Sequence, residues 1–185
     1  MIVMKFGGTS VESRAAIERV GGIVSSRGGR QPVVVVSAIG RTTNRLLAIA
    51  ADAAGGKRDA AIASLDELHQ SHVRESSGLG VDSQVESHFR ELSDLVKGLA
   101  VMGELTPRAT DAISSFGERI SSIVVAAVFR CMGISASHLD SRRVIVTDRR
   151  HTQAAPLFEP TNERLAAAMR DVAPDAVIVM GGFIA

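Results

Sequence analysis

The sequence contains few aromatic residues and a single cysteine. Phe, Trp and Tyr together make up 3% of the 185 residues, and neither Trp nor Tyr occurs. Such a chain lacks the aromatic platforms on which proteins stack nucleic-acid bases. The net charge of +1 gives no electrostatic reason to expect nucleic acid or an anionic membrane as a partner. Cys131 cannot form an internal disulfide, and we expect it to be a small core residue in an apolar helix.

Long apolar runs and targeting segments are also lacking. No apolar run reaches the ~18 residues of a membrane-spanning helix. The N-terminus enters a strand pattern within two residues, so no signal peptide is visible. We therefore expect a cytoplasmic protein without a membrane partner. Hydrophobic residues at 45% and charged residues at 22% are an ordinary balance for a globular domain with a sizeable core.

Short β-branched runs alternate with helical patterns along most of the chain. Continuous apolar runs at 2–4, 33–36 and 176–180 are typical of strands in a parallel sheet that is buried on both faces. Weaker strand candidates lie at 134–139 and 143–146. Helical patterns cover residues 11–27, 44–54, 60–75, 84–102, 107–132 and 161–171. The alternation predicts an α/β fold with a largely parallel central sheet.

Residues 57–102 interrupt this alternation with two helical stretches joined by a Ser/Gly-rich turn at 76–80. In the second stretch, apolar residues recur at spacings of three and four, at Val85, Phe89, Leu92, Val96 and Leu99. We interpret the segment as an inserted helical hairpin whose apolar stripe is internal packing rather than a partner surface. No cysteine or acidic cluster accompanies its three histidines, so we expect no metal site there.

The segment Lys5-Phe6-Gly7-Gly8-Thr9-Ser10 follows the first predicted strand and is the most informative part of the chain. Its glycines allow backbone N–H groups to approach a ligand closely. Thr9 and Glu12 have the spacing of a capping box at the start of a helix. A lysine, open amides and a helix N-terminus together favour phosphate binding. The alternative from these residues alone is a tight turn with a solvated lysine, and the spacings of P-loops and Rossmann turns are absent.

Three predicted strands end in small or polar residues. The first is followed by Gly7-Gly8, the second by Ser37-Ala38-Ile39-Gly40 and the third by Gly181-Gly182-Phe183. Because ligands bind outside the carboxyl ends of strands in open α/β sheets, these ends favour an anionic small-molecule site. Thr42 and Thr43 add hydroxyl groups after the second strand. We expect one of them to cap the helix that begins at Asn44.

Gly117 and Glu118 interrupt the apolar pattern of 107–132. Glycine inside a helix costs about 1 kcal/mol relative to alanine, so its presence indicates that another group approaches the helix closely. Glu118 lies among serines at helical spacing, at positions 114, 115, 121 and 122. This arrangement fits either a solvated polar face or a carboxylate at a cavity wall that receives a substrate ammonium group. The residues alone leave both interpretations open.

Taken together, these motifs resemble those of the aspartate kinases, within the amino acid kinase family. The likeness covers the chain in order, through residues 5–11, 36–44, 117–121, 140–148 and 180–185, and includes the helical insertion. It implies a three-layer α/β/α fold in which residues 1–185 form the N-terminal, amino-acid-binding lobe, with the insertion at about 57–102. The nucleotide-binding lobe and the regulatory ACT domains of the family would be absent from this chain.

The resemblance also implies a reaction, in which the γ-phosphoryl group of ATP passes to the β-carboxylate of L-aspartate with Mg²⁺ present. The product, 4-phospho-L-aspartate, leads to lysine, threonine and methionine. Lys5 would be the catalytic residue, neutralising charge on the phosphoryl group beside Gly7, Gly8, Thr9 and Ser10. The residues implied to contact aspartate are Ser37, Thr43, Glu118 and Phe183, with Glu118 binding the amino group.

Two alternatives remain open beside this reading. The chain resembles only the N-terminal portion of an aspartate kinase, so we expect it to be inactive alone and the full-length protein to be a homo-oligomer. A non-catalytic amino-acid-binding module of the same fold is one alternative. A related kinase with another acidic substrate is the second.

Overall fold

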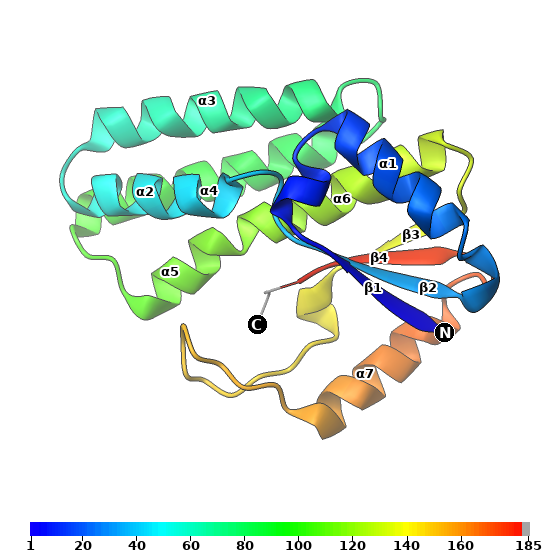
Figure 1. The fold of residues 1–185 in the computed structure, drawn as a ribbon. Helices are drawn as coiled ribbons and strands as arrows, with labels where there is room; N and C mark the ends of the chain where they lie inside the picture. Colours follow the sequence, from blue (N-terminus) through cyan, green and yellow to red (C-terminus); the bar gives the residue numbers. More distant parts are fainter. Residues whose placement is uncertain (183–185) are drawn as a thin grey trace.

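The computed structural model describes residues 1–182, in which strands and helices alternate (Figure 1). The strands are β1 (Ile2–Phe6), β2 (Pro32–Val36), β3 (Ala136–Leu139) and β4 (Val177–Gly181). The α-helices are α1 (Arg14–Ser25), α2 (Thr42–Ala54), α3 (Arg58–Ser76), α4 (Asp82–Met102), α5 (Pro107–Ser114), α6 (Phe116–Cys131) and α7 (Phe158–Arg170). Short 3₁₀ helices are η1 (Gly8–Val11), η2 (Gly28–Arg30) and η3 (Ser141–Arg143).

The four strands form one sheet in the order β1-β2-β4-β3, and every pair is parallel. Every residue of β4 is buried, as the continuous apolar run predicts. The candidate strand at 134–139 is confirmed as β3. The candidate at 143–146 is wrong, because the Asp140 carboxylate accepts the backbone N–H of Arg142 (3.0 Å) and turns the chain into η3.

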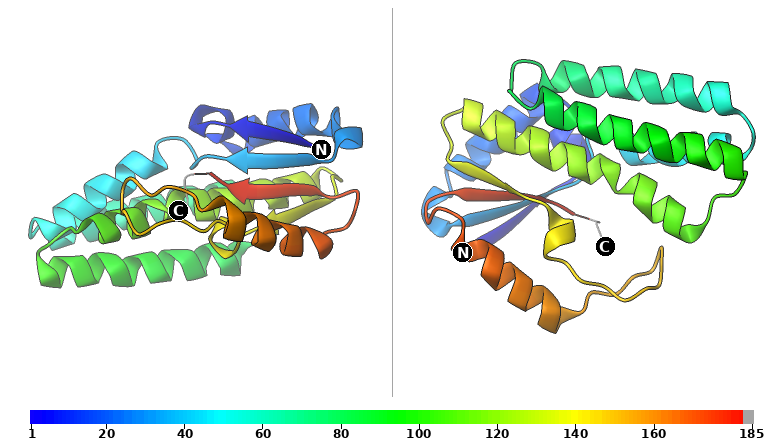
Figure 2. Two further views of the ribbon diagram at one scale, coloured as in Figure 1. Left: turned by 90° about the horizontal axis from the view of Figure 1, so that it is seen from below. Right: turned by 180° about the vertical axis from the view of Figure 1, so that it is seen from behind.

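Helices cover both faces of the sheet and give the three layers expected of the fold. Figures 1 and 2 show α1 and α6 on one face and α7 on the other. α6 is the central helix of the core, with every residue from Phe116 to Phe129 buried. Val34 and Val36 of β2 belong to the same apolar cluster as this helix. The sheet face that carries α7 is less covered, and Val3 of β1 is 67% exposed there.

The inserted helical hairpin is present as α3 and α4, which pack against each other and against α2 (Figure 1). The apolar stripe of α4 is buried at each of its five predicted positions, Val85, Phe89, Leu92, Val96 and Leu99. The stripe is therefore internal packing, as predicted.

The long helix predicted at 107–132 begins as expected but is divided. Thr106 caps α5 by accepting the N–H of Ala109 (3.2 Å), with Pro107 at the first helical position. Ser115 then separates α5 from α6, and Gly133 ends α6 with a positive φ of 78°. Cys131 is exposed because the last turn of α6 leaves the core, so its predicted burial is wrong.

The segment Pro107–Cys131 is long and apolar enough to cross a membrane by length and composition, contrary to our expectation from apolar runs. However, 89% of its most apolar window is buried inside the fold. Its hydrophobicity therefore matches its place at the centre of the core.

Gly117 allows α6 to lie directly against the loop that follows β2. A Cβ atom at this position would lie only 2.7 Å from the Cβ of Ala38. The glycine is thus explained by the close approach that its unfavourable helix propensity indicated.

Replacing Gly117 by alanine should lower the free energy of unfolding, because the added methyl group overpacks the contact with Ala38. We expect a loss of about 1–3 kcal/mol in urea denaturation. Gly98→Ala in α4 is the matched control, since no atom lies within 4 Å of its Cβ position. That variant should gain up to about 1 kcal/mol from helix propensity alone. Equal effects of the two substitutions would contradict the close packing of α6.

Candidate functional site

The carboxyl ends of the central strands are joined by hydrogen bonds just beyond the sheet. The N–H of Ser37 donates to the carbonyl of Phe6 (3.0 Å), and the N–H of Gly182 donates to the carbonyl of Val36 (2.8 Å). The hydroxyl of Ser141 donates to the carbonyl of Gly181 (2.6 Å). These bonds fix the ends of β1, β2 and β4 relative to one another.

Glu118 points from α6 toward the end of β2 and is only 3% exposed. Its Oε1 accepts the backbone N–H of Ala38 (3.2 Å) and lies 3.5 Å from the hydroxyl of Ser37. Its Oε2 is buried and has no partner among residues 1–182. Burial raises the pKa of this carboxyl group, opposed by its hydrogen bonds to Ala38 and Ser37. A solvated polar face is therefore excluded, and the site has a carboxylate oxygen available for a donor.

Two further hydroxyl-bearing residues lie where the start of α6 meets the segment after β2. Ser121 of α6 donates to the carbonyl of Ser37 (2.6 Å), which fixes the loop after β2. The Oγ1 of Thr43 lies 3.6 Å from the position that a Cβ on Gly117 would take. The structure thus brings the candidates Ser37, Thr43 and Glu118 together.

The start of α2 differs from the prediction in one detail. The helix begins at Thr42 rather than Asn44, and no side chain caps it. The hydroxyl of Thr42 donates to the carbonyl of Ile39 (2.6 Å) instead. Thr43 is consequently free of a capping role.

Arg119 anchors the first turn of α6 to α4. This buried side chain lies 3.9 Å over the ring of Phe116 and donates to both carboxylate oxygens of Glu91 in α4 (2.6 and 3.3 Å). The Arg119 hydrogen bonds hold the pKa of Glu91 below its usual value against partial burial. The helical hairpin therefore fixes the helix that carries Glu118.

Lys5 approaches the same edge from the opposite face of the sheet. Met4 and Phe6 pack against the core, so alternation along β1 directs the side chain of Lys5 away from α6. The side chain is exposed and makes no hydrogen bond or ion pair within the part of the chain that the structure describes. Gly8 is required nearby, because its Cβ would lie 2.7 Å from the carbonyl oxygen of Gly40. Lysine and glycines are thus placed as expected at the end of β1.

The predicted capping box of Thr9 and Glu12 is wrong. The chain first forms η1, and Ser13 then caps α1 by accepting the N–H of Ala16 (3.3 Å). The N–H of Arg14 in the first turn of α1 already donates to the carboxylate of Glu75 (2.6 Å). The N-terminus of α1 therefore contacts α3, and phosphate binding by this segment stays a prediction.

The remaining candidates are less well defined by the structure. Thr9 and Ser10 are exposed in η1, and Gly7 precedes it. Phe183 lies outside the described residues. No group of three or more His, Cys, Asp or Glu side chains that could hold a metal ion occurs within residues 1–182.

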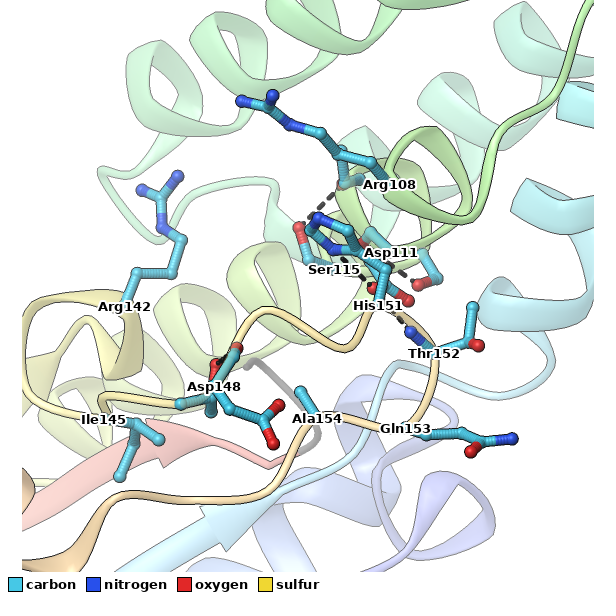
Figure 3. Close-up of a pocket in the computed structure, with 13 residues that line it drawn as sticks. Arg108, Asp111, Ser115, Arg142, Ile145, Asp148, His151, Thr152, Gln153 and Ala154 are labelled. Atoms are coloured by element: carbon cyan, nitrogen blue, oxygen red, sulfur yellow. Dashed lines mark hydrogen bonds and ion pairs between the residues drawn. The ribbon is translucent and has the colours of Figure 1, made fainter.

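A cavity of about 460 Å³ lies between α5 and the loop after η3, and no sequence motif had indicated it. Charged side chains in its lining include Arg108, Asp111, Arg142 and Asp148 (Figure 3). Ser114 and Ser115 also line it, immediately before the start of α6. The cavity is therefore next to the helix turn that carries Glu118.

Comparison with known proteins decides the family. The model of the amino acid kinase family matches residues 1–185.

The chain belongs to the amino acid kinase family.

Its similarity within this family is to aspartokinases. It is 38% identical over 151 residues to the chloroplastic aspartokinase 2 of Arabidopsis thaliana, covering 79% of this chain and 28% of the relative. It is 33% identical over 189 residues to the chloroplastic aspartokinase 1 of the same plant, covering 98% and 33%.

Solved structures show the same likeness. Escherichia coli aspartokinase III in complex with lysine and aspartate matches with a TM-score of 0.85 at 25% identity. The complex of that enzyme with aspartate and ADP matches with a TM-score of 0.83 at 26% identity. Both matches cover 98% of this chain and 40% of the solved chain. The chain thus spans 28–40% of the length of these three relatives.

The buried carboxyl group of this family member should make stability depend on pH in a defined direction. Because its pKa is higher in the folded than in the unfolded protein, Glu118 binds its proton more tightly when folded. Stability is therefore lost as pH rises through the interval between the unfolded and the folded pKa. As the pH rises above about 4.3, the pKa of a glutamate in unfolded peptides, urea unfolding should show wild type losing stability relative to Glu118→Gln.

The exposed Glu104 provides the control for this measurement. Glu104→Gln removes an exposed carboxyl group and measures the effect of the Glu-to-Gln substitution itself at each pH. A Glu118→Gln variant that behaves like Glu104→Gln would contradict the burial of an ionisable group at the end of β2.

Proposed function

We propose that this chain is the N-terminal, amino-acid-binding portion of an aspartate kinase. The full protein would transfer the γ-phosphoryl group of ATP to the β-carboxylate of L-aspartate and so form 4-phospho-L-aspartate. The observation that carries the proposal is the buried Oε2 of Glu118 at the carboxyl end of the sheet, which has no partner among residues 1–182. The aspartokinase relatives support it, including a solved aspartokinase III with aspartate and ADP bound.

The surroundings of Glu118 favour a substrate with a free amino group. A buried carboxylate oxygen without a donor is costly, and a substrate ammonium group would satisfy its charge and its hydrogen-bonding capacity together. N-acetylated acids lack that cation. We propose that the hydroxyls of Ser37 and Thr43 contact the substrate, with Phe183 as a further contact. L-Aspartate fits this combination better than an N-acylated acid.

The protein takes little part in the covalent chemistry of the proposed reaction. The acceptor carboxylate is itself the nucleophile, so catalysis requires alignment of the two reactants and neutralisation of the charge that spreads over the phosphoryl oxygens. Glu118 would hold the acceptor from the α6 side of the sheet edge. Lys5 would approach from the other face and neutralise the phosphoryl group beside Gly7 and Gly8.

ATP would supply the phosphoryl group, and Thr9 and Ser10 would lie beside its phosphates. We include Mg²⁺ as the usual companion of ATP in phosphoryl transfer. No ligand cluster for a metal is found in residues 1–182, so we assign the ion to none of them. Several features of the full protein stay predictions. They are the nucleotide-binding lobe, the ACT domains, a homo-oligomer, a cytoplasmic location and the pathways to lysine, threonine and methionine.

The experiment that tests the proposal is a kinase assay of the full-length protein with L-aspartate and ATP. Lys5→Ala should lower kcat by about 10²–10³-fold, because one preorganised positive charge is removed from the transferring group. The fold should persist, since the Lys5 side chain is exposed. Lys97→Ala on the exposed surface of α4 is the matched control and should leave kcat unchanged.

The same assay separates the alternatives. The isolated 185 residues should show negligible turnover. A full-length protein that binds aspartate without turning over ATP would establish the non-catalytic module instead. A preference for an N-acetylated acid would establish a different kinase of the same fold, and an unchanged kcat in Lys5→Ala would remove Lys5 from the mechanism.

A further inference from the structure

Residues 144–157 form a hairpin-like arm between η3 and α7, which we call the 144–157 arm. Its two sides are joined by a single antiparallel bridge between Thr147 and Pro156. Near the bridge, the N–H of Asp148 donates to the carbonyl of Ala155 (3.0 Å), and the N–H of Leu157 donates to that of Val146 (2.8 Å). The arm therefore has internal order despite the absence of a regular strand.

The base of the 144–157 arm is fixed at the edge of the sheet and on α7. Ser141, just before it, donates to the carbonyl of Gly181 at the end of β4. The hydroxyl of Thr161 in α7 accepts the N–H of Val146 (3.0 Å). These two anchors hold the base of the arm at the carboxyl end of the sheet, next to the proposed substrate site.

The tip of the arm reaches across to α5 and docks on one side chain. The Oδ2 of Asp111 accepts the N–H of Thr152 (2.8 Å) and lies 3.2 Å from the Nδ1 of His151 (Figure 3). Thr152 adopts a φ of +66°, a left-handed conformation that a β-branched residue rarely takes. The docking contact thus holds a backbone conformation that the residue does not itself prefer.

The docked arm forms one wall of the cavity of about 460 Å³ beside α5. This volume lies within the usual range for small-molecule sites. Its other wall includes Ser114 and Ser115, which lead into the turn that carries Glu118. The 144–157 arm consequently encloses space next to the start of α6, although Ser37, Thr43 and Glu118 are not among the residues that line it.

The acidic groups of this cavity are occupied by the arm, whereas its basic groups retain free donors. Asp148 accepts the N–H groups of Arg150 (3.0 Å) and Ala155 (3.3 Å) and the Nε of Arg150 (2.9 Å). Arg142 binds Asp140 through Nε and Nη2 only. The side chain of Arg108 makes no hydrogen bond or ion pair among residues 1–182. The donors left over suit an acidic ligand.

From these contacts we infer that Asp111 is a positioning residue. It docks the 144–157 arm on α5, and the docked arm closes the cavity next to the start of α6, whose free arginine donors would bind an acidic group of the amino-acid substrate. This inference rests on the proposed function and extends it to the 144–157 arm, for which the mechanism above has no role. The arm strengthens substrate binding without touching the phosphoryl group.

Substitution of Asp111 in the full-length protein tests the inference. In Asp111→Ala, hydrogen exchange of a peptide covering 149–154 should accelerate about tenfold, because the N–H of Thr152 loses its acceptor. The KM for L-aspartate should rise about three- to tenfold, while kcat and the KM for ATP change less than about twofold. Asp111→Asn should recover part of the KM effect, since the amide oxygen still accepts the N–H of Thr152.

Two control variants keep the result interpretable. Arg149→Ala at the tip removes a side chain that makes no hydrogen bond or ion pair in residues 1–182, and it should change neither exchange nor KM. Thr152→Gly relieves the positive φ, keeps the donor N–H and should leave KM unchanged or lower.

Faster exchange in Asp111→Ala with an unchanged KM for L-aspartate would overturn the inference, as would unprotected exchange of 149–154 in wild type. A parallel fall of kcat and stability, with no rescue by Asp111→Asn, would also overturn it. Failure of the proposed function would be recognised by a different result, namely a wild-type protein without aspartate-dependent turnover. That result would remove the basis of this inference as well.

Discussion

A buried carboxylate joins α6 to the end of β2, and the geometry of the candidate site depends on that interaction. Glu118 accepts the N–H of Ala38 through one oxygen, and its other oxygen is buried without a partner in the part of the chain that the structure describes. Burying such a group is unfavourable unless something donates to it. The fold tolerates the cost because Gly117 brings α6 into contact with Ala38 and Arg119 fixes the same turn on its far side. Substrate binding would then satisfy an acceptor that folding leaves unsatisfied.

The parallel sheet explains why residues distant in sequence share this site. With β1, β2 and β4 parallel and adjacent, their carboxyl ends meet at one edge, and the loops there carry the polar groups. Pleat alternation places Lys5 on one face of the sheet, and the core helix presents Glu118 from the other. Such an arrangement allows an acceptor and a phosphoryl donor to meet at the edge from opposite faces. The same edge anchors the 144–157 arm through Ser141.

The sequence predicted most clearly what depends on local pattern. The valine run at 33–36 identified a buried parallel strand, Thr106-Pro107 identified a helix start, and Gly117 identified a close approach before its partner Ala38 was known. Errors and unresolved alternatives arose where distant groups decide the local structure. The start of α1 is engaged by Glu75 from α3, and burial of Glu118 depends on its contact with the loop after β2. Docking of the arm on Asp111 leaves no sequence pattern, because two distant segments form it.

The most direct test of the account asks whether the free oxygen of Glu118 selects a substrate amino group. L-Aspartate and succinate differ in that group, so each should be titrated into the full-length protein while its dissociation constant is measured by calorimetry. The account predicts that wild type binds aspartate at least about tenfold more tightly than succinate and that Glu118→Gln abolishes the difference. Equal affinities for the two acids in wild type, or a preference for aspartate that survives in Glu118→Gln, would contradict it.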